Sequence, residues 1–133
     1  MNDLIKEWGP LVGRSILALI FLTSGLGKIG GFQATAGYMV SKGVPLANIA
    51  LVLTIIIEVG GAAMIILGFK ARIGAAALFL WMIPVNIMMH NFWSVPEAAK
   101  QVQMIMFMKN LSMMGAMLLI MAFGSGPKSL KAD

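Results

Sequence analysis

Four blocks of apolar residues, each about as long as a membrane is thick, dominate this chain of 133 residues. A helix rises about 1.5 Å per residue, so about 20 residues cross the ~30 Å of hydrocarbon in a bilayer. The blocks predict membrane-spanning helices at about 11–28, 46–68, 73–93 and 104–124. Only 11% of the residues are charged, against about 25% in an average soluble domain. We therefore expect an all-α integral membrane protein, a single-domain four-helix bundle of up-down topology over residues 1–133.

The alternative interpretation of the first block is a cleavable signal peptide, because Arg14 precedes an apolar stretch of suitable length at Ser15–Gly27. Three observations favour a retained span. Leu11–Gly13 extends the block towards the N-terminus, no A-x-A-like cleavage site follows it, and Lys28 ends it as a headgroup anchor would. We expect this block to remain in the protein as the first span.

The segments outside the blocks are short and contain turn-forming or polar residues. The link at 27–45 holds several glycines and Pro45, which predicts a loop with a short interfacial helix at Phe32–Ser41. Residues 1–10 are amphipathic enough to lie on the membrane surface. Residues 124–133 are expected to form a flexible polar tail.

Four spans place both termini on the same side of the membrane. The basic residues outside the spans divide into Lys6, Lys70, Arg72, Lys128 and Lys131 on that side, and Lys28, Lys42 and Lys100 on the other. Because Lys and Arg are enriched in cytoplasmic loops, this distribution predicts that both termini are cytoplasmic.

A carboxylate at mid-depth of the second span, Glu58, is the polar residue that most needs an explanation. An ionisable group at the bilayer centre costs roughly 2.5–3.5 kcal/mol on insertion scales. The short Glu side chain cannot reach the headgroups, so it requires a partner inside the bundle. We predict that a lysine is this partner, and that Lys109 in the fourth span has the reach to pair with it.

The up-down arrangement gathers further polar residues in the half of the bundle far from the termini. Lys28 ends the first span there, His90 ends the third, and Lys109 lies early in the fourth. Ser24 shares a helix face with Lys28, and Asn86 shares one with His90, because each pair is four residues apart. We predict a polar pocket inside the bundle, with Glu58 as its deep counter-charge. The candidate ligand-binding residues are Arg14, Ser24, Lys28, Glu58, Asn86, His90, Lys109 and Asn110.

Each of these residues also has a simpler interpretation. Arg14, Lys28 and Lys109 can extend their long side chains to the headgroups. His90 near an interface can be an ordinary hydrogen-bonding histidine. Glu58 can join helices without any chemistry, since polar pairs also hold membrane helices together.

Small residues and methionines are most simply explained by packing. The pairs Gly60–Gly61 and Gly115–Ala116 predict close helix approach. Thirteen methionines are present, and thioethers at helical spacing, as in Met113 and Met117, are ligands suited to Cu(I). Methionine more often fills irregular gaps in a core, so we expect neither copper nor another metal.

The composition excludes several classes of function. The chain has no cysteine, which excludes disulfides, thiol redox chemistry and Cys-ligated clusters within it. Its net charge of +5 comes from scattered basic residues, so we expect no nucleic-acid partner. A single histidine excludes a haem held by two histidines of one chain. Without a nucleotide-binding glycine loop, an HExxH motif or a serine nucleophile elbow, self-contained catalysis is not expected.

Short motifs follow one another in a fixed order over residues 10–124. They are Gly13-Arg14, Ser24-Gly25 with Lys28, Lys42-Gly43-Val44-Pro45, Glu58-Val59-Gly60-Gly61 with Leu67-Gly68 and Arg72, His90-Asn91-Phe92, and Lys109-Asn110-Leu111 with Gly115. No single motif is specific. In this order and spacing the chain resembles the DoxX family of small four-helix bacterial membrane proteins.

The resemblance implies a multi-pass protein of the bacterial inner membrane. The family takes its name from a subunit associated with quinone-linked sulfur oxidation, and some members are linked to redox or oxidative-stress complexes. It therefore implies a membrane subunit that works with other protein subunits or as a homo-oligomer. The cofactor stays open, with a quinone as one candidate. The family's recurring polar positions fall here on Arg14, Ser24, Lys28, Glu58, His90, Lys109 and Asn110.

Three hypotheses about function follow. The first is a membrane subunit of a redox-linked assembly that binds a quinone or another amphiphile. The second is a structural or assembly module without chemistry, acting with a partner chain or as a homo-oligomer. The third is transport of a proton or a small solute, for which four helices would need to oligomerise.

Overall fold

The structure is a computed structural model that describes residues 2–133, and its named elements are all helical. The elements are α1 (Asn2–Gly30), α2 (Phe32–Ser41), α3 (Ala47–Leu67), α4 (Ala71–Met89), the 3-10 helix η1 (Phe92–Ser94) and α5 (Glu97–Phe123). Four segments are long and apolar enough to cross a membrane: α1, α3, α4 together with η1, and α5. The predicted all-α fold with four spans is therefore confirmed, as is the short helix between the first two spans.

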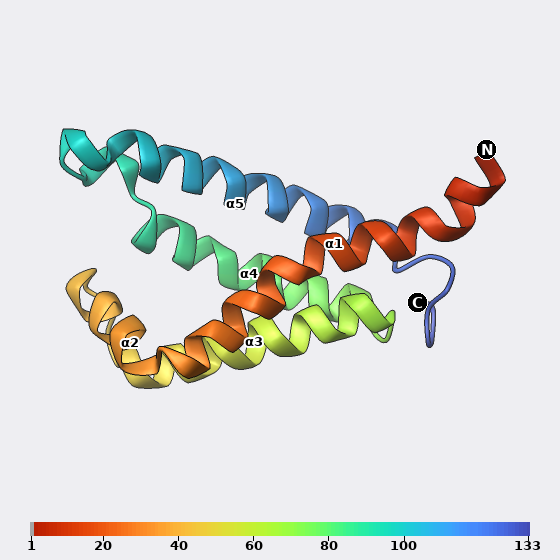
Figure 1. Cartoon of the computed structure of the whole chain (residues 1–133), viewed down its shortest axis with the longest axis horizontal. Helices are drawn as coiled ribbons and strands as arrows, with labels where there is room; N and C mark the ends of the chain where they lie inside the picture. Colours follow the sequence, from red (N-terminus) through yellow and green to blue (C-terminus); the bar gives the residue numbers. More distant parts are fainter. Residues whose placement is uncertain (1) are drawn as a thin grey trace.

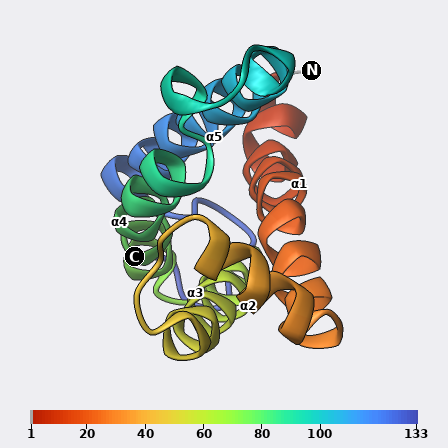
Figure 2. The same ribbon diagram turned by 90° about the vertical axis from the view of Figure 1, so that its left-hand side faces the viewer.

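The four long helices run alternately in opposite directions, so that both chain ends lie at one end of the bundle (Figure 1). We call this the terminal end, and the opposite end, which carries α2 and η1, the distal end. α1 packs against α3, α3 against α4, and α4 against α5, while α2 packs beside the start of α3. α1 and α5 diverge towards the distal end, and Figure 2 shows them on separate sides of the molecule.

Two helices are longer than the sequence predicted. Residues 2–10 continue α1 through Pro10 as its first turns, where a separate surface segment was expected. α5 begins at Glu97, seven residues before the predicted start of the fourth span, directly after Pro96. The start of α5 suits both residues, because the N–H that Pro96 lacks would have no partner within the helix there, and the Glu97 carboxylate complements the helix dipole.

Close packing of α3 on α4 depends on two glycines that face each other. A Cβ atom added at Gly61 would lie 2.9 Å from Leu78 Cγ, and one at Gly74 would lie 3.0 Å from the carbonyl oxygen of Gly61. The packing predicted for the Gly60–Gly61 pair is thus confirmed at Gly61. At Gly115 in α5 a Cβ would meet no atom of residues 2–133 within 4 Å, so the close approach predicted there is wrong.

Arg14 holds the terminal end of the bundle together, and we call its contacts the Arg14 anchor. The side chain is only 5% exposed and donates hydrogen bonds to backbone carbonyls of two segments far apart in sequence. The Arg14 guanidinium donates to the carbonyls of Ile65 (2.9 Å), Ser125 (3.0 Å), Pro127 (3.1 Å) and Lys128 (2.7 Å). The expectations for Arg14, a headgroup contact or a place in the distal polar cluster, are both wrong.

Residues 124–133 pack against the terminal end of α3, where a flexible tail was expected. Leu130 N–H donates to the carbonyl of Leu67 (2.9 Å), and Lys131 N–H donates to that of Gly68 (3.0 Å). Gly68 ends α3 in the left-handed conformation, with φ of 68°, which glycine adopts at little cost. The tail thus pairs with backbone groups at a helix end that would otherwise need water.

We expect Gly61→Ala to lower the free energy of unfolding by about 1–3 kcal/mol, because the new methyl group overpacks the contact of α3 with α4. Gly60→Ala is the matched control, since a Cβ there meets no atom of the described chain within 4 Å. Unfolding both variants in mixed micelles with increasing SDS measures the difference. Equal stability of the two variants would contradict the packing described here.

We expect Arg14→Gln to lower the free energy of unfolding by roughly 3 kcal/mol. A glutamine cannot reach both sets of carbonyls, and hydrogen bonds to a charged donor contribute about 1.5–3 kcal/mol each. Lys6→Gln removes the same charge from an exposed position of α1 and should leave stability unchanged. A melting temperature of Arg14→Gln equal to that of Lys6→Gln would show that the Arg14 anchor contributes little.

Candidate functional site

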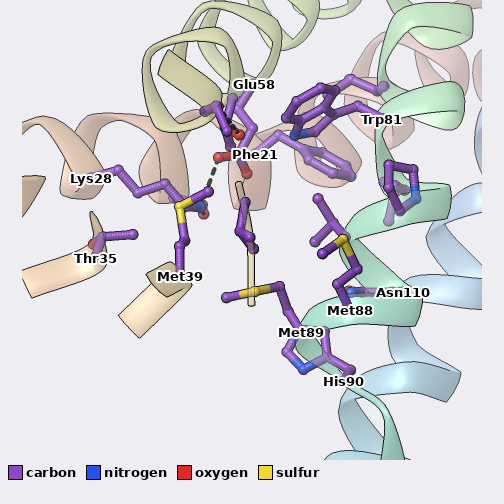
Figure 3. A pocket seen from close by; sticks show the side chains of 18 of the residues that line it. Phe21, Lys28, Thr35, Met39, Glu58, Trp81, Met88, Met89, His90 and Asn110 are labelled. Atoms are coloured by element: carbon purple, nitrogen blue, oxygen red, sulfur yellow. Dashed lines mark hydrogen bonds and ion pairs between the residues drawn. The ribbon is translucent and has the colours of Figure 1, made fainter. Parts of the chain in front are cut away.

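A cavity of about 370 Å³ lies in the distal half of the bundle, and all five α-helices contribute to its walls. Its volume falls within the range of roughly 300–1,000 Å³ that is typical of small-molecule sites. Most of the lining is apolar and includes the ring of Tyr38. Figure 3 shows the rings of Phe21 and Trp81 and the thioethers of Met39, Met88 and Met89 on this wall. The wall of the cavity is therefore mainly apolar and carries only a few polar side chains.

An ion pair between Lys28 and Glu58 forms the charged part of this wall. Lys28 Nζ lies 2.7 Å from Glu58 Oε1 and donates a second hydrogen bond, of 2.6 Å, to Ser24 Oγ. The Glu58 side chain is 12% exposed and that of Lys28 is 26% exposed. The prediction that Glu58 has a lysine partner inside the bundle is confirmed. The choice of Lys109 was wrong, as was the alternative that Lys28 extends to the headgroups.

The pair forms because α1 and α3 approach closely at the level of Glu58. Gly25 is buried, and a Cβ there would lie 2.7 Å from Val59 Cγ2 and 3.2 Å from Glu58 Cβ. Ser24 and Lys28, four residues apart, face the same side of α1. The absent side chain at Gly25 therefore brings the helix axes together, and Lys28 reaches Glu58 across the gap.

Lys109 is exposed on the outside of α5. The inner face of this helix carries Asn110 and Met113, which line the cavity, and Met117, which is fully buried. One residue turns a helix by about 100°, so Lys109 next to Asn110 points away from that face. The Lys109 side chain is long, but it leaves α5 on the outer face of the helix. It therefore points away from Glu58 and does not contact it.

The predicted residues differ in whether they line the cavity. His90 lines the cavity, and its Nδ1 lies 2.9 Å from Gln103 Oε1 in α5. Asn86 Nδ2 donates to the carbonyl of Phe107 (3.2 Å) and joins α4 to α5. Five of the eight candidates therefore line the cavity, namely Ser24, Lys28, Glu58, His90 and Asn110. The other three lie elsewhere, namely Arg14, Asn86 and Lys109.

The distal end of the cavity is covered by α2 and the residues around η1. Thr35, Tyr38 and Met39 of α2 line the cavity. Lys42, directly after α2, donates a hydrogen bond of 2.9 Å from Nζ to Asn91 Oδ1, directly before η1. This bond joins the two distal segments and fixes α2 over the cavity.

Most of the aromatic and thioether residues that line the cavity are not marked in the sequence. One signal was available, because Trp is enriched at membrane interfaces, whereas Trp81 stands in the middle of α4. No comparable signal marks Phe21 or Met39, which look like ordinary apolar residues of a span. As for metals, the described residues contain no group of three or more His, Cys, Asp or Glu placed to hold an ion.

We expect Lys28→Met and Glu58→Met each to lower the free energy of unfolding by about 3 kcal/mol, because each leaves an unpaired charge in a largely buried position. The double variant should recover much of the loss, since it leaves no charge. Lys109→Met is the matched control and should change stability by less than about 0.5 kcal/mol. If the two single losses simply add in the double variant, the two side chains do not interact.

Comparison with known proteins gives one consistent result. The DoxX family model matches residues 9–91. The chain is 35% identical over 120 residues to the inner membrane protein YphA of Escherichia coli (strain K12), covering 90% of this chain and 86% of that protein. It is 34% identical over 126 residues to the inner membrane protein YqjF of the same strain, covering 95% of this chain and 92% of that protein.

A third relative is larger. The chain is 30% identical over 127 residues to the Surfeit locus protein 4 homolog of Schizosaccharomyces pombe (strain 972), covering 94% of this chain and 37% of that protein. No solved structure matches the chain. The family match, the two bacterial relatives and the four spans agree with the resemblance found in the sequence: the chain is an integral membrane protein of the DoxX family.

Proposed function

We propose that this protein is the quinone-binding membrane subunit of a redox-linked assembly in the bacterial inner membrane. The observation that carries the proposal is the cavity itself, in which the Lys28–Glu58 pair is set into an aromatic and thioether wall. The relatives YphA and YqjF, named as inner membrane proteins, support the location. The distribution of basic residues supports cytoplasmic termini.

The donor groups of the cavity suit the ring of a quinone, which is flat and apolar and carries two carbonyl oxygens. Lys28 Nζ has three N–H groups, of which two are used by Ser24 and Glu58, so the third is available to a carbonyl oxygen. The aromatic and methionine side chains give the ring apolar, polarisable contacts. The residues of the cavity therefore fit this ligand class.

A bound quinone supplies the acceptor for two electrons and two protons. In the proposal, a redox-active partner subunit delivers the electrons, since the chain has no cysteine thiols to do so. Glu58 and His90 are the groups of the cavity that hold and pass protons. Lys28 holds the Glu58 side chain in place between transfers through its hydrogen bond of 2.7 Å.

Access from the bilayer is consistent with a lipid-soluble ligand. Ile20 of α1 lines the cavity and is 41% exposed, so the cavity reaches the flank of the bundle beside α1. α1 and α5 diverge towards the distal end, as Figure 1 shows. A molecule dissolved in the hydrocarbon can thus reach the ion pair without crossing the headgroups.

A purely structural or assembly module is the second candidate, and one observation favours it. Lys28 with Glu58, and Arg14 with its carbonyls, are charges that stabilise the bundle whether or not a ligand binds. In this case the protein would serve as a scaffold for partner chains or for a homo-oligomer, and the cavity would be filled by lipid. Quinone binding is the property that separates the two candidates.

We expect the protein in nanodiscs to bind decylubiquinone, and Glu58→Gln and His90→Ala to weaken binding about tenfold each. Glutamine keeps the shape of the Glu58 side chain but removes the charge that positions Lys28. A tenfold change in the dissociation constant corresponds to about 1.4 kcal/mol of binding free energy. Isothermal titration calorimetry, with empty nanodiscs as the blank, measures the affinity. Lys109→Met, outside the cavity, should bind like the unchanged protein.

Two results would reject the proposal. One is the absence of binding by the unchanged protein beyond partition into the lipid. The other is equal affinity of Glu58→Gln, His90→Ala and Lys109→Met, which would place any bound quinone elsewhere. Either result would favour the structural module.

A further inference from the structure

The imidazole ring of His90 is held at the distal end of the cavity by a side chain of α5. Its Nδ1 atom lies 2.9 Å from Oε1 of Gln103. His90 lines the cavity whereas Gln103 does not, so Gln103 contacts the ring from outside the cavity wall. The chain has one histidine, so this ring is the single imidazole that the sequence supplies.

The residues on both sides of this contact have fixed positions. The N–H of His90 donates to the carbonyl of Asn86 in the last turn of α4 (3.3 Å). Phe107 lies four residues after Gln103, on the same face of α5. Its ring packs edge-to-face on that of Phe92 in η1, with the centroids 5.3 Å apart. The link from α4 to η1 is therefore attached to α5 beside the ring, which gives the imidazole a defined direction.

Gln103 Oε1 determines which nitrogen of the His90 ring carries the hydrogen. An amide oxygen only accepts hydrogen bonds, so the Nδ1 atom that faces it donates. In a neutral imidazole the other nitrogen then holds the lone pair. Nε2 of His90 is therefore an acceptor in the neutral ring, and it can take up a proton while the bond to Gln103 stays in place.

The Nε2 atom is the nitrogen of this ring that a ligand can reach. It makes no hydrogen bond within residues 2–133. The side-chain atoms that are both buried and without a partner in this part of the chain are Trp81 Nε1 and Asn86 Oδ1. Nε2 is not one of them, so it keeps accessible surface. The two nitrogens of an imidazole point in widely different directions, so Nε2 also faces away from Gln103.

We infer that Gln103 is a positioning residue, which fixes Nε2 of His90 as the atom that exchanges protons with the ligand of the cavity. The inference rests on the proposed function and deepens it, because it states how each redox form of the ligand is recognised. A quinol hydroxyl donates to the Nε2 lone pair of the neutral ring. A quinone carbonyl has no hydrogen to donate, and it accepts from the same atom once Nε2 is protonated.

The proton transfer follows from this arrangement. In the proposed reduction, the electrons come from the partner subunit. Protonated His90 gives the hydrogen on Nε2 to a ligand oxygen as a proton, and the electron pair of the broken N–H bond stays on Nε2. Gln103 keeps the other hydrogen on Nδ1 throughout, so the ring returns to the tautomer from which it started.

The first experiment measures the tautomer by NMR of the protein in nanodiscs, with ¹⁵N-labelled histidine. The single histidine gives one pair of ring nitrogen signals, recorded under alkaline conditions on the neutral ring. We expect the hydrogen on Nδ1 in the unchanged protein and in Gln101→Leu, an exposed control on the same helix. Gln103→Leu should change to the Nε2–H form, which neutral histidine prefers in water. Gln103→Glu retains an acceptor and should keep the hydrogen on Nδ1.

The second experiment adds decylubiquinol, the reduced probe, to the same samples under anaerobic conditions. The Nε2 signal should shift in the unchanged protein and in Gln101→Leu, because the lone pair accepts a hydrogen bond from the hydroxyl. We expect Gln103→Leu to bind decylubiquinol about five to ten times more weakly, since this hydrogen bond is lost.

The outcomes separate this inference from the proposed function. A hydrogen on Nε2 in the unchanged protein overturns the role of Gln103, and so does the same tautomer in the unchanged protein and in Gln103→Leu. Decylubiquinol that binds without a shift of the Nε2 signal overturns the proton exchange and leaves the quinone site standing. If the unchanged protein binds neither decylubiquinol nor decylubiquinone, the proposed function fails. The tautomers of the unliganded variants then still decide whether Gln103 positions the ring.

Discussion

In hydrocarbon a charge or a free backbone carbonyl is stable only when another protein group satisfies it, and both ends of this bundle are organised by that constraint. At the terminal end one cation, Arg14, collects carbonyls from the end of α3 and from residues 125–128. At the distal half another cation, Lys28, is held by Ser24 and Glu58. Both belong to α1, so this helix is attached to α3 at two depths and, through Arg14, to residues 125–128. Much of the remaining interior is apolar.

The elements that could be predicted from the sequence are those that depend on local composition. The four spans follow from hydropathy, and the need of Glu58 for a cationic partner follows from its depth and short side chain. The identity of the partner depends on the rotation of each helix about its axis, which one residue changes by about 100°. Lys109 illustrates this, because it lies at a suitable depth but on the outer face of α5. Gly25, which allows α1 to approach α3, was noted in the sequence only as part of a motif.

Two features could not be predicted, for a different reason. The acceptors of Arg14 are backbone carbonyls, which every residue has, so the sequence carries no mark of them. The wall of the cavity is built from residues such as Phe21 and Met39, whose types are the same as those of lipid-facing positions. The helices that line the cavity include α1 and α5, which diverge towards the distal end, and the course of a helix axis is not marked by any residue type. Trp81 is the exception, because its N–H makes an apolar position chemically distinct.

The Arg14 anchor has a consequence for the way the protein is made. Arg14 and its acceptor at Ser125 are 111 residues apart in the chain. A ribosome adds about 5–20 residues per second, so roughly 5–20 seconds pass between the synthesis of the cation and that of its partner. During this interval α1 has a guanidinium whose acceptors at residues 125–128 do not yet exist. The contacts of the first helix are thus complete only after the last residues of the chain have been made.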